Sequence, residues 1–101
     1  MARYQMEDGT VLDTERSTQS WDEESDWNGS NWVSRATGSQ WNHETLYRSR
    51  RGRYYIEHIS QMQGVRARAA WIEKRDAAAW LLLMGHKIPD ELAEVADEVV
   101  E

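Results

Sequence analysis

Towards the C-terminal end of the chain, apolar residues recur at the spacing of amphipathic helices. They fall at i, i+3, i+4 and i+7 in two successive stretches, first Ala77, Trp80, Leu81 and Met84 and then Leu92, Val95, Ala96 and Val99. This spacing places each set on one helical face. Gly85 suits the left-handed residue that ends a helix, and Pro89 suits a first helical turn. The pattern therefore predicts one helix over residues 76–84 and a second over residues 89–99.

The middle of the chain carries a pattern typical of strands. Aromatic and β-branched residues are concentrated in residues 44–48 and 53–59, which flank a short connection closed by Gly52. Such side chains favour strands, and glycine suits the turn between them. Residues 65–72 begin with apolar or small residues that alternate with arginine, which indicates a further strand. These segments predict a three-stranded antiparallel meander.

A hairpin signal lies near the N-terminus, where Asp8-Gly9 separates the short segments 4–6 and 10–12. The whole pattern predicts an α+β fold, in which a small antiparallel β-sheet (an N-terminal hairpin plus the meander) is followed by two C-terminal α-helices. We expect one helix to pack across the sheet. The length of 101 residues suits a single compact domain over residues 1–101.

Residues 13–40 interrupt this pattern. They are dominated by Ser, Thr, Asn, Asp, Glu and Gly, yet they contain Trp21, Trp27 and Trp32, and Trp41 follows directly. Acidic disordered segments rarely carry aromatic residues at this density. We therefore expect a long ordered loop, held in place wherever a tryptophan inserts into the core. Loops of this length within a compact domain are usually either functional or poorly ordered.

Charge divides the chain into three blocks. Residues 1–30 carry a net charge of −6, residues 31–75 carry +6 and residues 76–101 carry −6, which gives the −6 of the whole chain. Either the blocks neutralise one another in the fold or stay solvated, or one block is a docking surface for a charged partner. The chain has no cysteine, which excludes disulfides and thiolate sites. No apolar run is long enough to span a membrane, so we expect a cytoplasmic protein.

The basic block contains a candidate nucleic-acid-binding surface. Tyrosines that could stack on bases are interleaved with its arginines. Arginine forks suit phosphate, although basic residues on a hairpin tip and an edge strand also deter edge-to-edge pairing of sheets. The arginines are Arg48, Arg50, Arg51 and Arg53, with Arg66 and Arg68 on the neighbouring strand.

The acidic N-terminal block contains a candidate partner-binding surface. Four of its carboxylates fall within five residues and have indoles beside them, so that tryptophan would anchor the contact. The alternative is a solvated acidic loop. The residues are Trp21, Asp22, Glu23, Glu24, Asp26 and Trp27.

Metal and catalytic patterns are weak. His43 and His58 would lie on one sheet face if the 49–52 loop had four residues, yet no third ligand accompanies them. Residues 24–29 follow the first half of a calcium-binding loop, but Arg35 stands where its last glutamate belongs. No P-loop, dinucleotide-binding or nucleophile-elbow motif occurs. We expect no catalytic residue, metal or cofactor; a hydrolase or nuclease built on the two histidines is the remaining enzymatic alternative.

Residues 37–47, 52–58 and 77–82 resemble small proteins carried by phages and plasmids. Compact acidic proteins of that kind include anti-CRISPR and other anti-defence inhibitors, some of which mimic DNA. The resemblance implies a stoichiometric inhibitor of a host nucleic-acid-handling complex. Its partner would be a host protein or ribonucleoprotein, with direct nucleic-acid binding as the alternative function, and the inhibitor would act as a monomer or homodimer.

Overall fold

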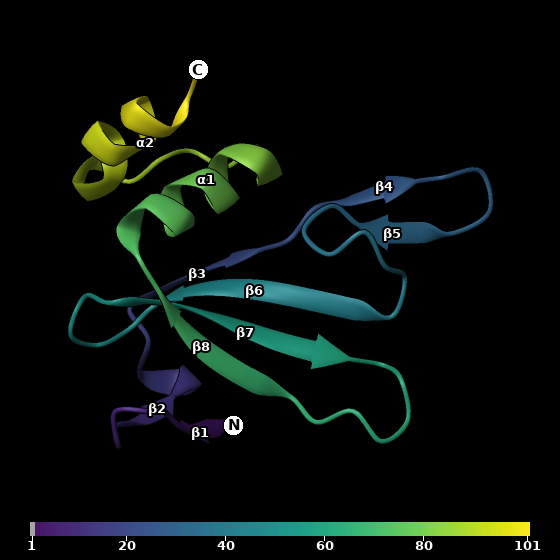
Figure 1. The fold of residues 1–101 in the computed structure, drawn as a ribbon, viewed down its shortest axis with the longest axis horizontal. Coiled ribbons are helices and arrows are strands. Elements are labelled where there is room, and N and C mark those ends of the chain that lie inside the picture. The colour runs from purple at the N-terminus through teal and green to yellow at the C-terminus, as the bar shows by residue number, and fades with distance from the viewer. Residues whose placement is uncertain (1) are drawn as a thin grey trace.

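A computed structural model describes residues 2–101. Antiparallel sheets are followed by two C-terminal helices, which confirms the predicted α+β class (Figure 1). In chain order the elements are β1 (Arg3–Gln5), β2 (Val11–Asp13), the 3-10 turn η1 (Thr14–Arg16), β3 (Gln19–Asp22), β4 (Ser25–Trp27), β5 (Trp32–Ser34), β6 (Asn42–Arg48), β7 (Tyr54–Ser60), β8 (Arg68–Ile72), α1 (Lys74–Met84), the 3-10 turn η2 (Asp90–Leu92) and α2 (Ala93–Val99).

The main sheet has the strand order β3-β6-β7-β8, with antiparallel neighbours throughout. The predicted meander is confirmed as β6-β7-β8, and β3 adds a fourth strand beside β6. Residues 13–40 are therefore not the long loop predicted from composition, since they contain β3 and the separate hairpin β4–β5. The sequence did not predict these strands because their residues are mostly polar. An edge strand and an isolated hairpin bury few side chains and therefore need few apolar residues.

One face of the sheet packs against the helices. Leu46, Tyr54, Ile56 and Ile72 alternate along the strands on this face and contact the core beneath α1. From α1, all four residues of the predicted apolar face are buried, together with Ala78. Gly85 ends this helix in the left-handed conformation, as predicted, with φ of 77°.

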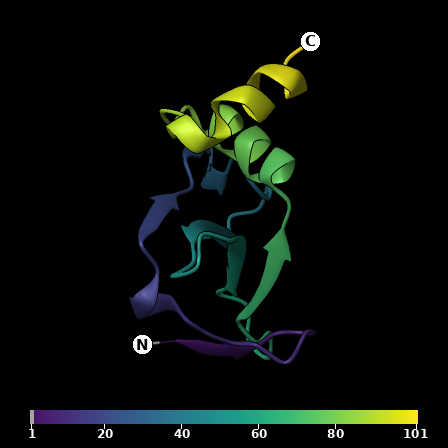
Figure 2. The same ribbon diagram turned by 90° about the vertical axis from the view of Figure 1, so that its left-hand side faces the viewer.

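The second predicted helix forms, with a different start. Its first turn is the 3-10 turn η2, and regular α-helix begins only at Ala93. Leu92 and Ala96 are buried against the core shared with α1. The helix therefore packs mainly against α1 (Figure 2).

The opposite face of the sheet packs against the N-terminal hairpin. Gly9 takes a positive φ of 86°, and Met6 and Leu12 turn inward onto the fully buried Tyr55. Tyr55 stacks in turn on Tyr47, with ring centroids 5.0 Å apart. The sheet is therefore the middle of three layers, with the helices on one side and β1–β2 on the other (Figures 1 and 2).

Arg48 joins the sheet to the helical layer. Its Nε donates to Glu91 Oε1 at 2.7 Å, and its Nη1 donates to Thr18 Oγ1 at 3.0 Å. The hydroxyl of Tyr54 also donates to Glu91. These hydrogen bonds from Arg48 and Tyr54 lower the pKa of the Glu91 carboxyl.

We expect Leu46→Ala to lower the free energy of unfolding by about 2–5 kcal/mol, because Leu46 is fully buried between α1 and the sheet. Urea unfolding followed by circular dichroism measures this. Leu83→Ala makes the same change at a side chain that is 67% exposed, and it should cost no more than about 0.5 kcal/mol. Equal losses in both variants would contradict the described core.

We expect Glu91→Gln to destabilise the fold at neutral pH and to lose that effect in acid. Ionised Glu91 stabilises the fold above the unfolded-state pKa of about 4.3, because its folded-state pKa is lower. This contribution disappears as the pH falls through the folded-state pKa. Urea midpoints of wild type and variant should therefore approach each other as the pH falls below about 4.3 and converge only below the lowered folded-state pKa. Glu94→Gln, at an exposed residue of α2, is the control; a constant difference across all pH values would refute the ion pair.

Candidate functional site

The β4–β5 hairpin projects from the main sheet as a separate two-stranded ribbon (Figure 1). Its turn is organised by Asn28, whose Oδ1 accepts hydrogen bonds from the backbone N–H of Ser30 at 2.9 Å and Asn31 at 2.8 Å. Gly29 supplies the positive φ of 99° that the turn needs. The tip therefore has a defined shape although it lies outside the core.

Two indoles face each other across this hairpin. Trp27 pairs directly with Trp32, and their ring centroids are 5.6 Å apart at an interplanar angle of 59°. They are 56% and 63% exposed, so the expectation that they insert into the core is wrong. The hairpin has no second layer behind it to receive them. Trp41 is also exposed, whereas Trp21 is partly buried and stacks on Tyr54.

The base of the hairpin is fixed by a bidentate ion pair. Arg35 Nη2 donates to Asp26 Oδ1 at 2.9 Å, and its Nε donates to Asp26 Oδ2 at 3.2 Å. These hydrogen bonds lower the pKa of the Asp26 carboxyl. Arg35 also donates to the carbonyl of Leu83 at 3.3 Å, which joins the hairpin to the end of α1. Asp26 is thus exposed yet already partnered.

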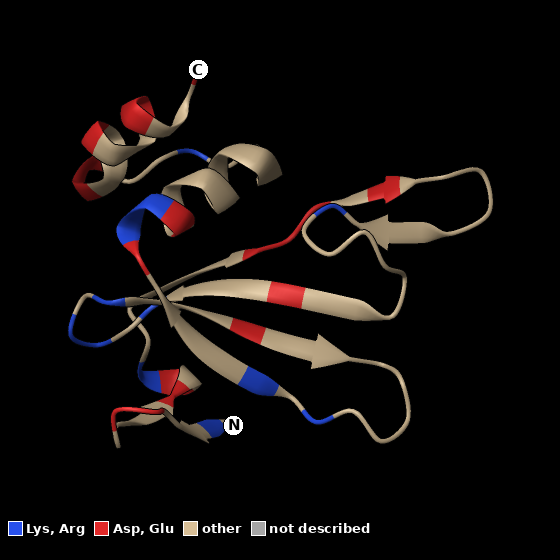
Figure 3. Cartoon of the chain, in the orientation of Figure 1, with Lys and Arg blue, Asp and Glu red and all other residues tan. Residues whose placement is uncertain are grey.

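Glu23 points inward, unlike its neighbours. Its carboxylate accepts hydrogen bonds from Ser34 Oγ at 2.8 Å and from the backbone N–H of Glu44 at 2.6 Å, and it pairs with His43 Nδ1 at 2.7 Å. Only 12% of this side chain is exposed. Glu23 therefore holds the β3–β4 connection against β6, and the exposed acidic residues at this surface are Asp22, Glu24 and Asp26 (Figure 3).

The structure divides the predicted basic surface. Arg48 is bound to Glu91, as described above, and Arg68 lines a separate cavity of about 230 Å³ on the helix-facing side of the sheet with Glu44 and His58. Arg66 is exposed in the β7–β8 connection. Of the six predicted arginines, only those of the β6–β7 connection share a site, namely Arg50, Arg51 and Arg53.

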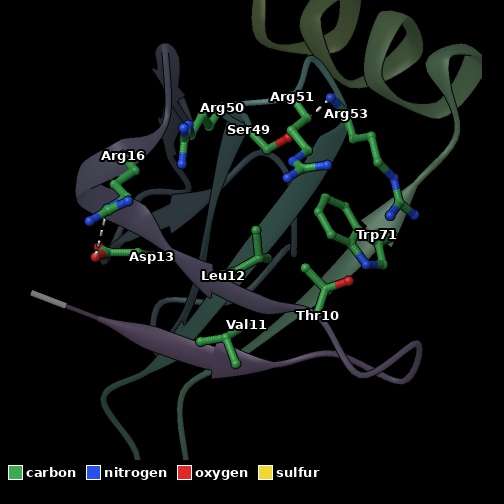
Figure 4. A pocket seen from close by; sticks show the side chains of 10 residues that line it. All are labelled: Thr10, Val11, Leu12, Asp13, Arg16, Ser49, Arg50, Arg51, Arg53 and Trp71. Atoms are coloured by element: carbon green, nitrogen blue, oxygen red, sulfur yellow. Dashed lines mark hydrogen bonds and ion pairs between the residues drawn. The ribbon is translucent and has the colours of Figure 1, made fainter.

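These three arginines surround a larger cavity of about 660 Å³ between the β6–β7 connection and the N-terminal hairpin (Figure 4). Arg16, on η1, completes a set of four, and Trp71 forms part of the wall. The guanidinium of Arg53 lies 3.7 Å from the centroid of the Trp71 ring and donates to Asp8 Oδ2 at 3.1 Å. The pKa of Asp8 falls to about 2, chiefly through the hydrogen bond from the Thr10 backbone and with a contribution from Arg53.

The two histidines proposed as a metal or catalytic pair lie on opposite faces of the sheet. The register pairs His43 with Ile59 and Glu44 with His58. The connection between the strands has one residue more than the sequence reading assumed, and a shift of one residue reverses the face of each side chain. Within residues 2–101, no three His, Asp or Glu side chains are grouped to hold a metal.

Several residues at these surfaces escaped the sequence analysis. Trp32 and Arg35 complete the hairpin, and Arg16 and Trp71 complete the basic cavity. The Asn28-Gly29 turn signal could have been interpreted as a hairpin turn. That interpretation would have placed Trp27 opposite Trp32. Nothing in the sequence joins Arg16 to the β6–β7 connection, because they meet only through packing of the N-terminal hairpin.

No family model, curated protein or solved structure matches the chain. In the part of the chain that the structure describes, neither helix has the length and apolar character needed to cross a membrane.

We expect Glu23→Ala to lower the free energy of unfolding by about 1–3 kcal/mol, because it leaves buried donors without their acceptor. Amide exchange at Glu44 should accelerate in this variant. Glu24→Ala removes an exposed carboxylate one residue away and should change neither measurement. If the two variants behaved alike, Glu23 would be a surface residue after all.

Proposed function

We propose that this protein is a phage or mobile-element inhibitor that binds a host nucleic-acid-handling complex through its β4–β5 hairpin. The observation that supports this most directly is the exposed pair of indoles, Trp27 and Trp32, on a projecting hairpin. Tryptophans are prominent among the residues that dominate binding energy at protein interfaces. A pair of rings already in contact in a defined conformation loses little further freedom on binding.

The charge around the indoles suits a basic partner. The exposed carboxylates are Asp22 at the end of β3, Glu24 in the β3–β4 connection and Asp26 in β4, and Arg35 is the single basic residue within residues 17–40. A protein that handles nucleic acid presents a positively charged groove to phosphates. Carboxylates that approach such a groove would compete with phosphate, and the indoles would supply the apolar anchor.

The test is affinity capture with the tagged full-length protein from cells of its host. Trp27→Ala/Trp32→Ala should weaken binding of the captured complex by about thirtyfold or more, the loss expected when an interface anchor is truncated. Affinity is then measured with the purified complex by biolayer interferometry. A second measurement asks whether the wild-type protein displaces nucleic acid from that complex.

Trp41→Ala is the matched control, because it removes another exposed indole that lies outside the hairpin. It should leave affinity unchanged, and both variants should keep the urea midpoint of the wild type. Recovery of the same partner at the same affinity by the hairpin variant would overturn the docking surface. A captured partner that neither binds nucleic acid nor loses it to the protein would overturn the proposed inhibition.

A further inference from the structure

Four arginines from separate parts of the chain converge on one cavity of an otherwise acidic protein. Arg16 comes from η1, and Arg50, Arg51 and Arg53 come from the β6–β7 connection (Figure 4). The only carboxylate among the lining residues is Asp13, which also caps η1 by accepting from the backbone N–H of Glu15. The cavity is therefore strongly positive, although the whole chain carries −6.

Two of these guanidiniums have no partner within residues 2–101. Arg16 and Arg53 contact Asp13 and Asp8, at 3.9 Å and 3.1 Å. Arg50 and Arg51 form no ion pair or hydrogen bond, although acidic residues outnumber basic ones by 18 to 12 in the chain. Unpaired arginines beside a cavity are available to a phosphate, whose oxygens match the guanidinium fork.

The backbone that carries Arg50 and Arg51 is held in place. Ser49 N–H donates to the carbonyl of Arg53 at 2.7 Å, and Gly52 N–H donates to the carbonyl of Ser49 at 3.0 Å. The Ser49 hydroxyl, which is buried, accepts from the N–H of Arg53 at 3.1 Å. The two arginines therefore extend from a closed turn with a defined shape, which lowers the entropy lost on binding.

The rest of the lining is mixed: Leu12 and Trp71 are apolar, and Thr10, Asp13 and Ser49 are polar. Leu12 points from β2 to the side of the arginines (Figure 4). Val11, the preceding residue, is 62% exposed and points to the opposite face of the strand. A volume of about 660 Å³ is in the range of sites for small organic ligands and far exceeds the need of an inorganic anion. The ligand that fits both features has a phosphate and a flat, partly apolar body.

We propose that this cavity binds a nucleoside phosphate, with Arg50 and Arg51 on the phosphate and the apolar side chains of Leu12 and Trp71 beside the nucleoside. The phosphate can come from a free mononucleotide or from the 5′-phosphorylated end of a strand, since both present the same group. This site is independent of the β4–β5 hairpin, and its test does not depend on the hairpin's partner.

The experiment is a calorimetric titration of the full-length protein at an ionic strength of about 0.15 M with inorganic phosphate, adenosine, adenosine 5′-monophosphate, and short oligonucleotides with either a 5′-phosphate or a 5′-hydroxyl. The phosphorylated nucleoside should bind more tightly than phosphate or adenosine alone. Arg50→Gln/Arg51→Gln should weaken it by about tenfold or more, because two charge-assisted contacts are lost. Tighter binding of the 5′-phosphorylated strand than of the mononucleotide identifies a strand end, and the reverse identifies a free nucleotide.

The matched control is Arg66→Gln/Arg68→Gln, which makes the same change in charge outside the cavity. It should bind within about twofold of the wild type, because exposed charges at this range are screened. Equal losses in the two double variants would show that only overall charge matters, and this would overturn the site. Absence of saturable binding would overturn it as well. So would failure of both adenosine 5′-monophosphate and the 5′-phosphorylated strand to bind more tightly than their counterparts without the phosphate.

Discussion

The architecture depends on burial of β7 from both sides. Tyr54 and Tyr55 are successive residues, so their rings point to opposite faces of the sheet, and both are almost completely buried. Tyr54 belongs to the core under α1, and Tyr55 belongs to the core under the N-terminal hairpin. Because one strand supplies both cores, the helical layer and the hairpin layer are positioned relative to each other through it.

Hydrogen bonds also join the sheet to the layer on each of its faces. On the helix side, Glu91 receives Arg48 and Tyr54. On the hairpin side, the buried Glu57 accepts from the hydroxyls of Tyr4 at 2.6 Å and Tyr47 at 3.3 Å. Burial is the main cause of the raised pKa of Tyr47, about 12, with Glu57 nearby contributing. Burial raises the pKa of Tyr4 as well. The hydroxyls of Tyr4 and Tyr47 therefore stay protonated and able to donate at neutral pH.

The three charge blocks of the sequence partly neutralise one another in space. Asp8, Asp26, Glu91 and Glu98, from the two acidic blocks, pair with Arg53, Arg35, Arg48 and Arg75 of the basic block. The first of the two interpretations of the charge map therefore holds for these residues. Within the described part of the chain, charged side chains that remain unpaired gather in two places. Exposed carboxylates lie beside the β4–β5 hairpin, and guanidiniums without a partner lie at the β6–β7 connection.

The sequence predicted the elements whose side chains are buried in a regular pattern. The face of α1, the Asp8-Gly9 hairpin and the meander all follow from local spacing. It could not predict β3 as a sheet strand, because three of its four residues are exposed and only its pairing with β6 defines it. The same limit applies to the sites. Glu23 turns inward and Arg16 joins the cavity through tertiary packing, which no spacing along the chain records.

The two exposed surfaces lie at opposite ends of the molecule, with the β4–β5 hairpin at one end of the long axis and the β6–β7 connection at the other (Figures 1 and 3). Exposed carboxylates of Asp22, Glu24 and Asp26 lie beside the first surface, and the guanidiniums of Arg50 and Arg51 lie at the second. Because the molecule is 39 Å long, two partners of opposite charge could bind at once without touching each other.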